Sequence, residues 1–377
     1  MKRLLITITY GIVLFAFFLY SYVLIDPNIT FFNSPVWSRF LEAVLQIGYY
    51  QRRLSWEIYL VLISCLTFFH LYFINQYKKY DPMKIGLMIA AILCLSYPFI
   101  SHDFLKYMFD AKILTQYHQN PYLMRPIDFS YDPWLRFLQW IEQPFRYGPV
   151  FFAIIIIPSF FAAGKFLLSF IFLKMTFVCF YIAAVFVLRK MNKKWAFIFA
   201  THPLLLVDGL INGHNDLISV SFLIFGIYFL SRKKILPRVF FILSIGIKYL
   251  SLPVIFITKN RNSIFNKLIF FSLLILPYLL LNQFFGNKFG AEIQTWYFII
   301  LLGFIPYFEG IINKLLITFI GLLLSCYPYI YLGKWEQING FAIKHIIILS
   351  FSFLNLILFF VIPSWRRELK EEMKLSF

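Results

Sequence analysis

Long apolar runs dominate this chain and constrain its fold more than any other feature. A helix needs roughly 20 apolar residues to cross the hydrocarbon core of a bilayer, and ten runs come close to this length or exceed it. They lie near residues 4–25, 55–75, 85–101, 163–188, 195–211, 214–230, 264–282, 297–312, 314–332 and 343–361. Only 14% of the 377 residues are charged, whereas about a quarter are charged in soluble domains. The sequence therefore predicts an all-α polytopic membrane protein, in which residues 1–377 form a single integral membrane domain.

Short basic segments between the runs predict the orientation of the chain, because cytoplasmic loops carry an excess of Lys and Arg. Both termini are expected in the cytoplasm, together with residues 76–84, 189–194, 231–234 and 259–267. The loops expected outside are residues 26–54, 102–148, 283–296 and 333–342. The formal net charge of +18 then favours contact with anionic membrane lipids and argues against nucleic acid as a partner. These features indicate a multi-pass protein of the cell membrane.

Two further apolar runs fit this orientation only if they do not cross the membrane. Counting residues 149–160 as a span would place the basic segment 189–194 on the outer side, so a helix lying in or dipping into the membrane is expected. The run 235–257 has basic residues at both ends, which predicts a re-entrant helical hairpin that turns near residues 246–248. Irregular backbone at membrane depth is tolerated where it lines a polar cavity.

The polar loop 102–148 is the main place where this chain can carry out polar chemistry. Asp103 stands where an apolar helix emerges, and partial loss of water there raises a carboxyl pKa toward a value suited to a general base. Tyr107 and Asp110 follow at helical spacing and are expected to share a face with Asp103. The alternative interpretation is that His102 and Asp103 only end the helix at the membrane surface.

The same loop contains turn signals and carboxylates beside aromatic residues. Asn120 and Tyr122 flank a proline, and Arg146 and Tyr147 precede a Gly-Pro pair, so the loop is expected to be folded. Asp128 lies among aromatic residues, a composition that suits sugar binding. An amphipathic loop resting on lipid would have a similar composition.

A second polar cluster separates two apolar runs at residues 208–216. It contains Asp208, Asn212, His214, Asn215 and Asp216. Polar groups between apolar helices cost free energy unless they form bonds. They are therefore expected either to bind substrate or to form a self-satisfied turn. In such a turn, Asn212 and the glycine after it supply left-handed backbone, and Asn215 or Asp216 caps the next helix.

Lys248 is the third candidate, because it stands alone within the expected hairpin. An ionisable residue within the membrane marks a functional site by default, and an ammonium group can bind the phosphate of a lipid carrier. The alternative is an ion pair with an acid such as Asp208. Lys174, near the end of an expected span, is interpreted as a lysine that reaches the membrane interface.

Taken together, these residues resemble the GT-C superfamily of polytopic glycosyltransferases, which use polyprenyl-phosphate sugars, and in particular its mannosyltransferase-like branch in bacteria and archaea. The resemblance covers roughly residues 85–260 and depends on the order of several short motifs. They are His102-Asp103-x-x-x-Tyr107, Asn120-Pro121-Tyr122 with Asp128, Tyr147-Gly148-Pro149, His202-Pro203 with Asp208, residues 212–216, and Lys248-Tyr249. The resemblance implies about ten transmembrane helices, a re-entrant hairpin and a helical first large outer loop.

The resemblance also implies an activity. Such enzymes invert the anomeric carbon and move a hexose, with mannose as the first expectation, from a polyprenyl-phosphate donor to a hydroxyl group of a glycan or glycolipid acceptor at the extracytoplasmic face. The implied base is Asp103, and residues 102–148 form the implied catalytic loop. Tyr107 and Asp110 are expected to place the substrates. His214 and Lys248, with Arg146, are expected to hold the phosphate.

Departures from the family pattern leave the sugar open. Many relatives have two adjacent acids or Ser-Asp where His102 precedes a single Asp103, and often Asn-Pro and Glu in place of His202-Pro203 and Asp208. No metal-ligand spacing is present and the four cysteines lie in apolar runs. No metal or other cofactor is therefore expected, although a divalent metal stays open.

Two other functional classes remain open from the residues alone. A transporter or flippase of lipid-linked sugars would use Lys248, Asp208 and His214 to line its path, but no internal repeat is visible. A non-catalytic subunit of an envelope-glycan assembly complex would have the same composition. The acceptor, the linkage, the length of the lipid and the oligomeric state are not specified by these residues.

Overall fold

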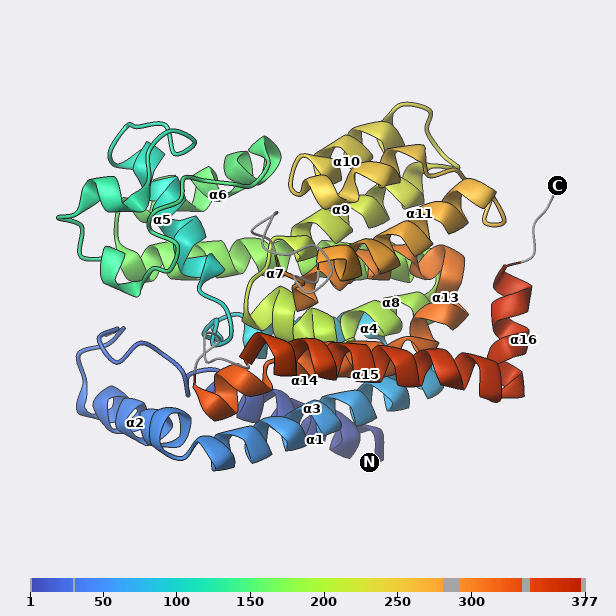
Figure 1. Ribbon diagram of the computed structural model, residues 1–377, viewed down its shortest axis with the longest axis horizontal. Helices are drawn as coiled ribbons and strands as arrows, with labels where there is room; N and C mark the ends of the chain where they lie inside the picture. The colour runs from blue at the N-terminus through green and yellow to red at the C-terminus, as the bar shows by residue number, and fades with distance from the viewer. Residues whose placement is uncertain (1, 30, 281–291, 334–339, 374–377) are drawn as a thin grey trace.

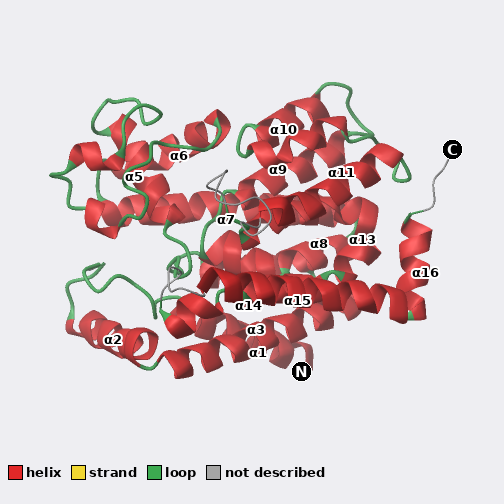
Figure 2. Ribbon diagram, viewed as in Figure 1, coloured by secondary structure: helices red, strands yellow, loops and turns green. Residues whose placement is uncertain are grey.

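The computed structural model describes residues 2–29, 31–280, 292–333 and 340–373, and all regular elements in these ranges are helical (Figures 1 and 2). The α-helices are α1 Lys2–Tyr20, α2 Pro35–Leu45, α3 Arg52–Asn75, α4 Pro82–Leu93, α5 Asp103–Thr115, α6 Pro149–Ala162, α7 Phe166–Met191, α8 Lys193–Ala200, α9 Asp216–Phe229, α10 Leu236–Ile245, α11 Ile264–Ile275, α13 Ile305–Lys314, α14 Leu316–Leu324, α15 Gly340–Val361 and α16 Pro363–Glu372. Short 3₁₀ or π segments include η5 Leu205–Ile211, η6 Tyr249–Phe256 and η9 Thr295–Phe304.

Within the described ranges, five helical segments are long and apolar enough to cross a membrane. They are Arg3–Tyr20, Arg52–Asn75, Phe166–Met191, Thr295–Lys314 and Gly340–Val361. A sixth candidate is the pair α8 and η5, which is bent by 67°. The multi-span all-α class is therefore confirmed. The ten spans expected from the sequence remain a prediction, because the other four runs form shorter helices.

One of these expected spans is interrupted by an irregular stretch that contains a proline. The run 85–101 begins as α4, but the helix ends at Leu93 and the chain continues without regular structure to α5. Pro98 lies in this stretch; proline has no N–H to donate and disfavours helical backbone in the residue before it. The irregular stretch delivers Asp103 to the start of α5, which begins a new helix instead of continuing α4.

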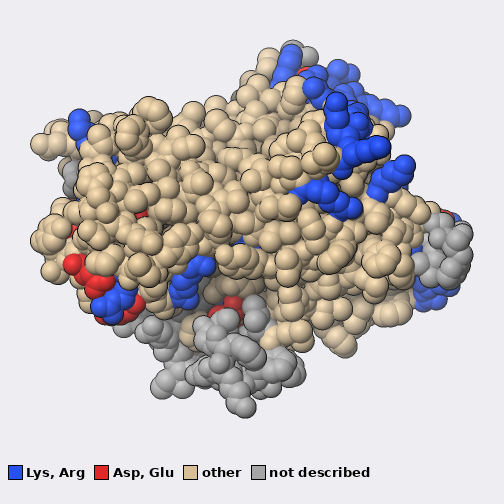
Figure 3. Space-filling model, turned by 90° about the horizontal axis from the view of Figure 1, so that it is seen from above, with Lys and Arg blue, Asp and Glu red and all other residues tan. Residues whose placement is uncertain are grey.

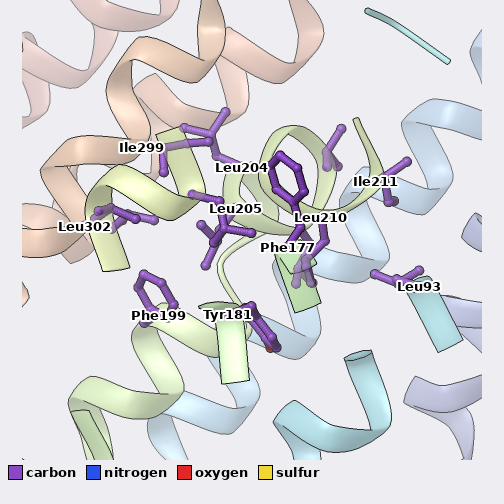
Figure 4. Packing of buried hydrophobic residues seen from close by; sticks show 14 of the residues in the cluster. Leu93, Phe177, Tyr181, Phe199, Leu204, Leu205, Leu210, Ile211, Ile299 and Leu302 are labelled. Carbon is purple, nitrogen blue, oxygen red and sulfur yellow. The ribbon is translucent and has the colours of Figure 1, made fainter. Parts of the chain in front are cut away.

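The core forms around α7, α8, η5 and η9. Phe177 and Tyr181 of α7, Phe199 of α8, Leu205 of η5 and Leu302 of η9 are fully buried and lie close together (Figure 4). Since lipid tails are as apolar as these side chains, the contacts stabilise the bundle chiefly through close packing. This packing fixes η5, whose C-terminal end carries the polar cluster 208–216.

The expected hairpin and the expected short helix are both present as local structures. The α10 helix turns at residues 246–248 into η6, and the Arg238 guanidinium donates a hydrogen bond to the Ile257 carbonyl at 3.2 Å. The α6 helix has 14 residues with Pro158 inside it, too few to cross a bilayer. How deeply either element enters the membrane remains a prediction.

The polar loop is folded against the bundle. Lys112 of α5 forms a buried ion pair with Asp132, and its ammonium lies 4.0 Å from the centre of the Trp134 ring system.

The α5–α6 region and the terminal helix α16 lie at opposite ends of the molecule (Figure 1). Figure 3 shows Lys and Arg gathered toward one end of the face that it displays, with a small group of Asp and Glu toward the other. Which end faces the cytoplasm remains a prediction.

Candidate active site

A cavity of about 880 Å³ collects residues from distant parts of the chain. Ser101 lines it, and the polar loop that follows contributes His102, Asp103, Lys106, Gln139, Trp140, Gln143, Arg146 and Tyr147. The lining from other segments includes Tyr59, Asp208, Lys248, Glu292, Gln294, Thr295, Trp296, Tyr297, Cys326, Tyr329 and Lys344. The acid at the start of α5 and the lysine of the hairpin therefore face the same space.

Asp103 is the first residue of α5 and lines this cavity. The Tyr147 hydroxyl donates a hydrogen bond to its Oδ2 at 3.1 Å, and Nδ1 of His214 lies 3.8 Å from the same oxygen. Burial raises the pKa of Asp103 above its ordinary value. The hydrogen bond from Tyr147 and the nearby positive charge of Lys248 oppose the shift. The carboxylate is thus a stronger base than an exposed one, while donors and cations still stabilise its charge.

Lys248 lies at the turn of the hairpin and is paired with an acid. Its Nζ lies 2.6 Å from Oδ2 of Asp216 and 4.3 Å from the centre of the Tyr297 ring. The sequence suggested Asp208 as a possible partner, whereas the ion pair is formed with Asp216. Lys248 is therefore neutralised by a buried carboxylate at the edge of the cavity.

The hairpin turn and the end of the polar loop are joined through their backbones. The N–H of Gly148 donates to the Ile247 carbonyl at 3.2 Å, and the N–H of Val150 donates to the Gly246 carbonyl at 2.9 Å. A Cβ at Gly148 would lie 2.1 Å from the Gly246 oxygen, so only glycine permits this approach. Tyr147 and Lys248 are the chain neighbours of the bonded residues Gly148 and Ile247, so these contacts hold both next to a short backbone bridge.

The polar side chains in the first half of the 208–216 cluster have hydrogen-bond partners within the protein. Asp208 accepts hydrogen bonds from Thr295 at 2.5 Å and from Asn212 at 3.2 Å, and the Asn212 side chain also accepts one from the N–H of Ile100. The left-handed residue is Gly213 alone, with φ of 69°, since Asn212 has right-handed helical backbone. The expectation of a left-handed Asn212 was therefore wrong.

The second half of the cluster faces the acid. The His214 ring stacks on Trp296 with 3.6 Å between ring centres, and its two nitrogens have no hydrogen-bond partner in the described structure. The Asn215 side chain is likewise buried without a partner and does not cap α9, contrary to one expectation. Asp216 begins α9 and pairs with Lys248.

The side chain of Lys174 stabilises the turn that follows η5. It is 1% exposed, and its ammonium donates to the carbonyls of Leu210 at 3.0 Å and Ile211 at 2.5 Å. It therefore binds the unsatisfied carbonyls at the end of η5. The expectation that Lys174 reaches the membrane interface was wrong, because the break after η5 creates a buried acceptor site.

The face of α5 that follows Asp103 is buried. Tyr107 is fully buried against Tyr147, with 5.1 Å between ring centres, and Asp110 pairs with Lys106 at 2.7 Å. Burial raises the pKa of Asp110 to about 6 even though Lys106 lowers it. Neither Tyr107 nor Asp110 lines the cavity, so both lie behind the residues that do.

Other loop residues stabilise the fold around the cavity. Asn120 accepts a hydrogen bond from the N–H of Tyr122, and the Tyr122 hydroxyl donates to the Tyr147 carbonyl at 3.3 Å. Asp128 pairs with Arg125 at 2.8 Å on the surface of the loop and does not line the cavity. These three side chains thus order the loop and lie outside the group around Asp103.

Arg146 differs from the other cations of the cavity. It is exposed and lines the cavity, and it makes no hydrogen bond or ion pair with any residue that the structure describes. Lys106 and Lys248 are both neutralised by carboxylates. Arg146 is therefore available to an anionic group in the cavity.

Several cavity residues were not found from the sequence, and they come from the C-terminal third. Trp296 and Tyr297 begin η9, and Lys344 near the start of α15 donates to Gln294 at 3.3 Å. Lys344 and His345 lie inside an apolar run, the same signal that identified Lys248.

Among the described residues, no group of three or more His, Cys, Asp or Glu side chains could hold a metal ion.

Comparison with known proteins gives one match. A family model described as "Alpha-(1->6)-mannopyranosyltransferase, N-terminal domain" of the MptA/B family matches residues 19–259, which is more than half of the chain. No curated protein and no solved structure gives a significant match. The matched residues include the polar loop, the 208–216 cluster and Lys248, whereas Trp296 and Lys344 lie beyond them.

Proposed function

The chain belongs to the alpha-(1->6)-mannopyranosyltransferases of the MptA/B family, glycosyltransferases that depend on polyprenyl-phosphate mannose, and from this premise we propose its reaction. The protein transfers mannose from a polyprenyl-phosphate donor to a hydroxyl group of a glycan or glycolipid acceptor. The reaction takes place at the extracytoplasmic face of the membrane. The observation that supports this proposal is the single cavity shared by Asp103, Tyr147, Arg146 and Lys248.

Asp103 acts as the general base in this proposal. Its carboxylate removes the proton of the acceptor hydroxyl while the acceptor oxygen forms a bond to the anomeric carbon of mannose. The bond between that carbon and the phosphate oxygen breaks, and the lipid phosphate leaves with the electron pair. Inversion with an alpha-linked product requires a beta-linked donor. The hydrogen bond from Tyr147 orients the carboxylate for this step.

Arg146 and Lys248 bind the donor phosphate. Arg146 makes the first contact because it has no partner among the described residues, and its planar guanidinium matches a phosphate. Lys248 contributes once the phosphate competes with Asp216 for its ammonium. Trp296 lines the cavity, and the His214 ring stacks on it beside the acid. Positive charge placed at the leaving oxygen stabilises the transition state.

The decisive experiment is mannosyl transfer by the purified protein in liposomes with radiolabelled polyprenyl-phosphate mannose. We expect Asp103→Asn to lower kcat by about 10²–10⁴-fold, because the base is lost while the shape of the side chain is kept. The matched control is Asp128→Asn, which removes a carboxylate of the same loop outside the cavity. Both variants are checked for folding by circular dichroism and size-exclusion chromatography.

Two outcomes contradict the proposal. Wild-type transfer rates in a folded Asp103→Asn variant would remove Asp103 from the reaction. Movement of the labelled lipid across the liposome membrane without any transfer would instead favour a transporter.

A further inference from the structure

Trp140 has an unusual position at the open edge of the cavity. Its side chain is 56% exposed although it is large and apolar, and it lines the same cavity as Asp103. Its φ is 60°, a left-handed conformation that bulky residues rarely adopt. Such strained backbone persists only where the surroundings hold it, and it is concentrated at ligand sites.

The surrounding loop holds this conformation through backbone hydrogen bonds. The N–H of Gln143 donates to the Trp140 carbonyl at 3.1 Å, which closes a tight turn, and the N–H of Ile127 donates to the Ile141 carbonyl at 3.1 Å. The second bond ties the turn to the rest of the polar loop. The indole is therefore presented at the cavity edge by a fixed turn.

The amide side chains on either side of Trp140 face the same cavity. Gln139 and Gln143 both line it, and Oε1 of Gln143 is buried without a hydrogen-bond partner. A buried carbonyl oxygen without a donor costs free energy. The oxygen is therefore free to accept a hydrogen bond from a ligand, and a hydroxyl group is a suitable donor.

We propose that Trp140, Gln139 and Gln143 form a second sugar subsite, which binds the sugar unit of the acceptor next to the unit that is attacked. The indole packs against the C–H face of the ring, and the amides exchange hydrogen bonds with its hydroxyl groups. None of these three side chains is charged, so the subsite suits a neutral sugar. This inference rests on the proposed function and extends it to an acceptor of at least two sugar units.

An exposed tryptophan can also lie in the headgroup region of a membrane. The buried oxygen of Gln143 favours the sugar subsite, because it offers an acceptor beside the indole that contact with lipid alone would leave unused. The sugar subsite therefore accounts for both side chains.

The test compares acceptors of different length that carry the same alkyl group, a mannoside and a 1→6-linked dimannoside. We expect the wild-type protein to have a lower KM for the dimannoside. Trp140→Ala should raise the KM for the dimannoside about tenfold more than the KM for the mannoside, because only the longer acceptor reaches the indole. Trp140→Phe should retain most of the preference. Gln143→Leu should lose part of it, since its amide is replaced by a side chain of similar size.

Tyr131→Ala is the matched control. Tyr131 is an aromatic residue of the same loop that is 74% exposed and does not line the cavity, so this variant should keep the wild-type preference. The KM for the donor should remain at the wild-type value in all four variants.

Three results would overturn the subsite. The first is an unchanged ratio of the two acceptor KM values in both Trp140→Ala and Gln143→Leu. The second is a wild-type protein without a preference for the longer acceptor. The third is an equal rise of KM for both acceptors and for the donor, together with weaker association of the protein with liposomes. The last result would assign Trp140 to the lipid surface. Absence of any transfer by the wild-type protein would instead refute the proposed function. If Trp140→Ala does not fold, Trp140→Phe and Gln143→Leu still decide the question.

Discussion

At the scale of single residues, the cavity combines one acid with cations that differ in availability. Asp103 is half-buried beside Tyr147, Lys248 is paired with Asp216, and Arg146 has no partner among the described residues. The proposed base and the proposed phosphate ligands thus line one cavity, and among Lys106, Arg146 and Lys248 only Arg146 is unpaired within the described residues.

The raised pKa of Asp103 predicts the pH dependence of the reaction. The base must be ionised, so kcat/KM should fall as the pH drops through this pKa. The midpoint of that decline should lie above 3.8, the ordinary value for Asp. Arg146→Gln removes a positive charge that lowers the pKa and should move the midpoint to higher pH. A pH–rate profile of both proteins measures the shift, and a midpoint that moves to lower pH would contradict this assignment.

The Lys248–Asp216 pair predicts a separation of stability from activity. Lys248→Met leaves a buried carboxylate unpaired and should destabilise the protein by about 3–5 kcal/mol. Adding Asp216→Asn removes that charge and should restore most of the stability, as measured by thermal unfolding in detergent. Transfer activity should remain low in the double variant, because the phosphate ligand is still missing. Wild-type activity in the double variant would show that Lys248 has only a structural role.

At the scale of elements, the site depends on places where helices break. The α4 helix ends before Pro98, η5 ends at the turn around Gly213, and α10 ends at the hairpin turn. Each break leaves backbone groups free to bond across elements. The Lys174 ammonium binds carbonyls at the end of η5, and the N–H of Gly148 binds the Ile247 carbonyl at the hairpin turn.

The bridge between the polar loop and the hairpin predicts the effect of a single methyl group. Gly148→Ala places a Cβ 2.1 Å from the Gly246 oxygen and should push the two turns apart. We expect kcat to fall by about 10²-fold while the protein stays folded, because a small displacement separates the base from the phosphate ligands. Gly11→Ala is the control, since its nearest neighbour would lie at an ordinary 3.7 Å. Equal activity of the two variants would show that the bridge does not position the site.

The sequence could predict apolar helices and the hairpin, because length, composition and flanking charge are local signals. Apart from the turn of the hairpin, it could not predict where the helices break, as α4 does after Leu93 and as the bent pair α8 and η5 does. The π segment η5 and its lysine cap depend on Lys174, which is 36 residues before Leu210 in the chain. The shared cavity of Asp103 and Lys248 could be inferred from the order of the motifs. The contribution of Trp296 could not, since its stacking on His214 is a tertiary contact without a periodic pattern.

At the scale of the whole molecule, the cavity joins the two parts of the chain. The family match ends at residue 259, but Trp296, Tyr297 and Lys344 complete the lining. The C-terminal third is therefore part of the site as well as of the membrane bundle.

The proposed orientation predicts the labelling of single cysteines introduced into a cysteine-free protein. A cysteine at position 131, in the polar loop, should react with a membrane-impermeant maleimide from outside intact cells. A cysteine at position 232, in a basic segment, should react only after permeabilisation. The reverse pattern would place the cavity on the cytoplasmic side and would contradict the proposed location of the reaction.

The ion pair at the edge of the cavity also bears on turnover. The proposed donor is a phosphodiester with one negative charge, whereas the lipid phosphate that it would release is a monoester that carries more charge near neutral pH. Cations alone would hold this product more tightly than the substrate and slow its departure. The carboxylate of Asp216, 2.6 Å from Lys248, is a resident competitor that can reclaim the ammonium and help the spent carrier leave.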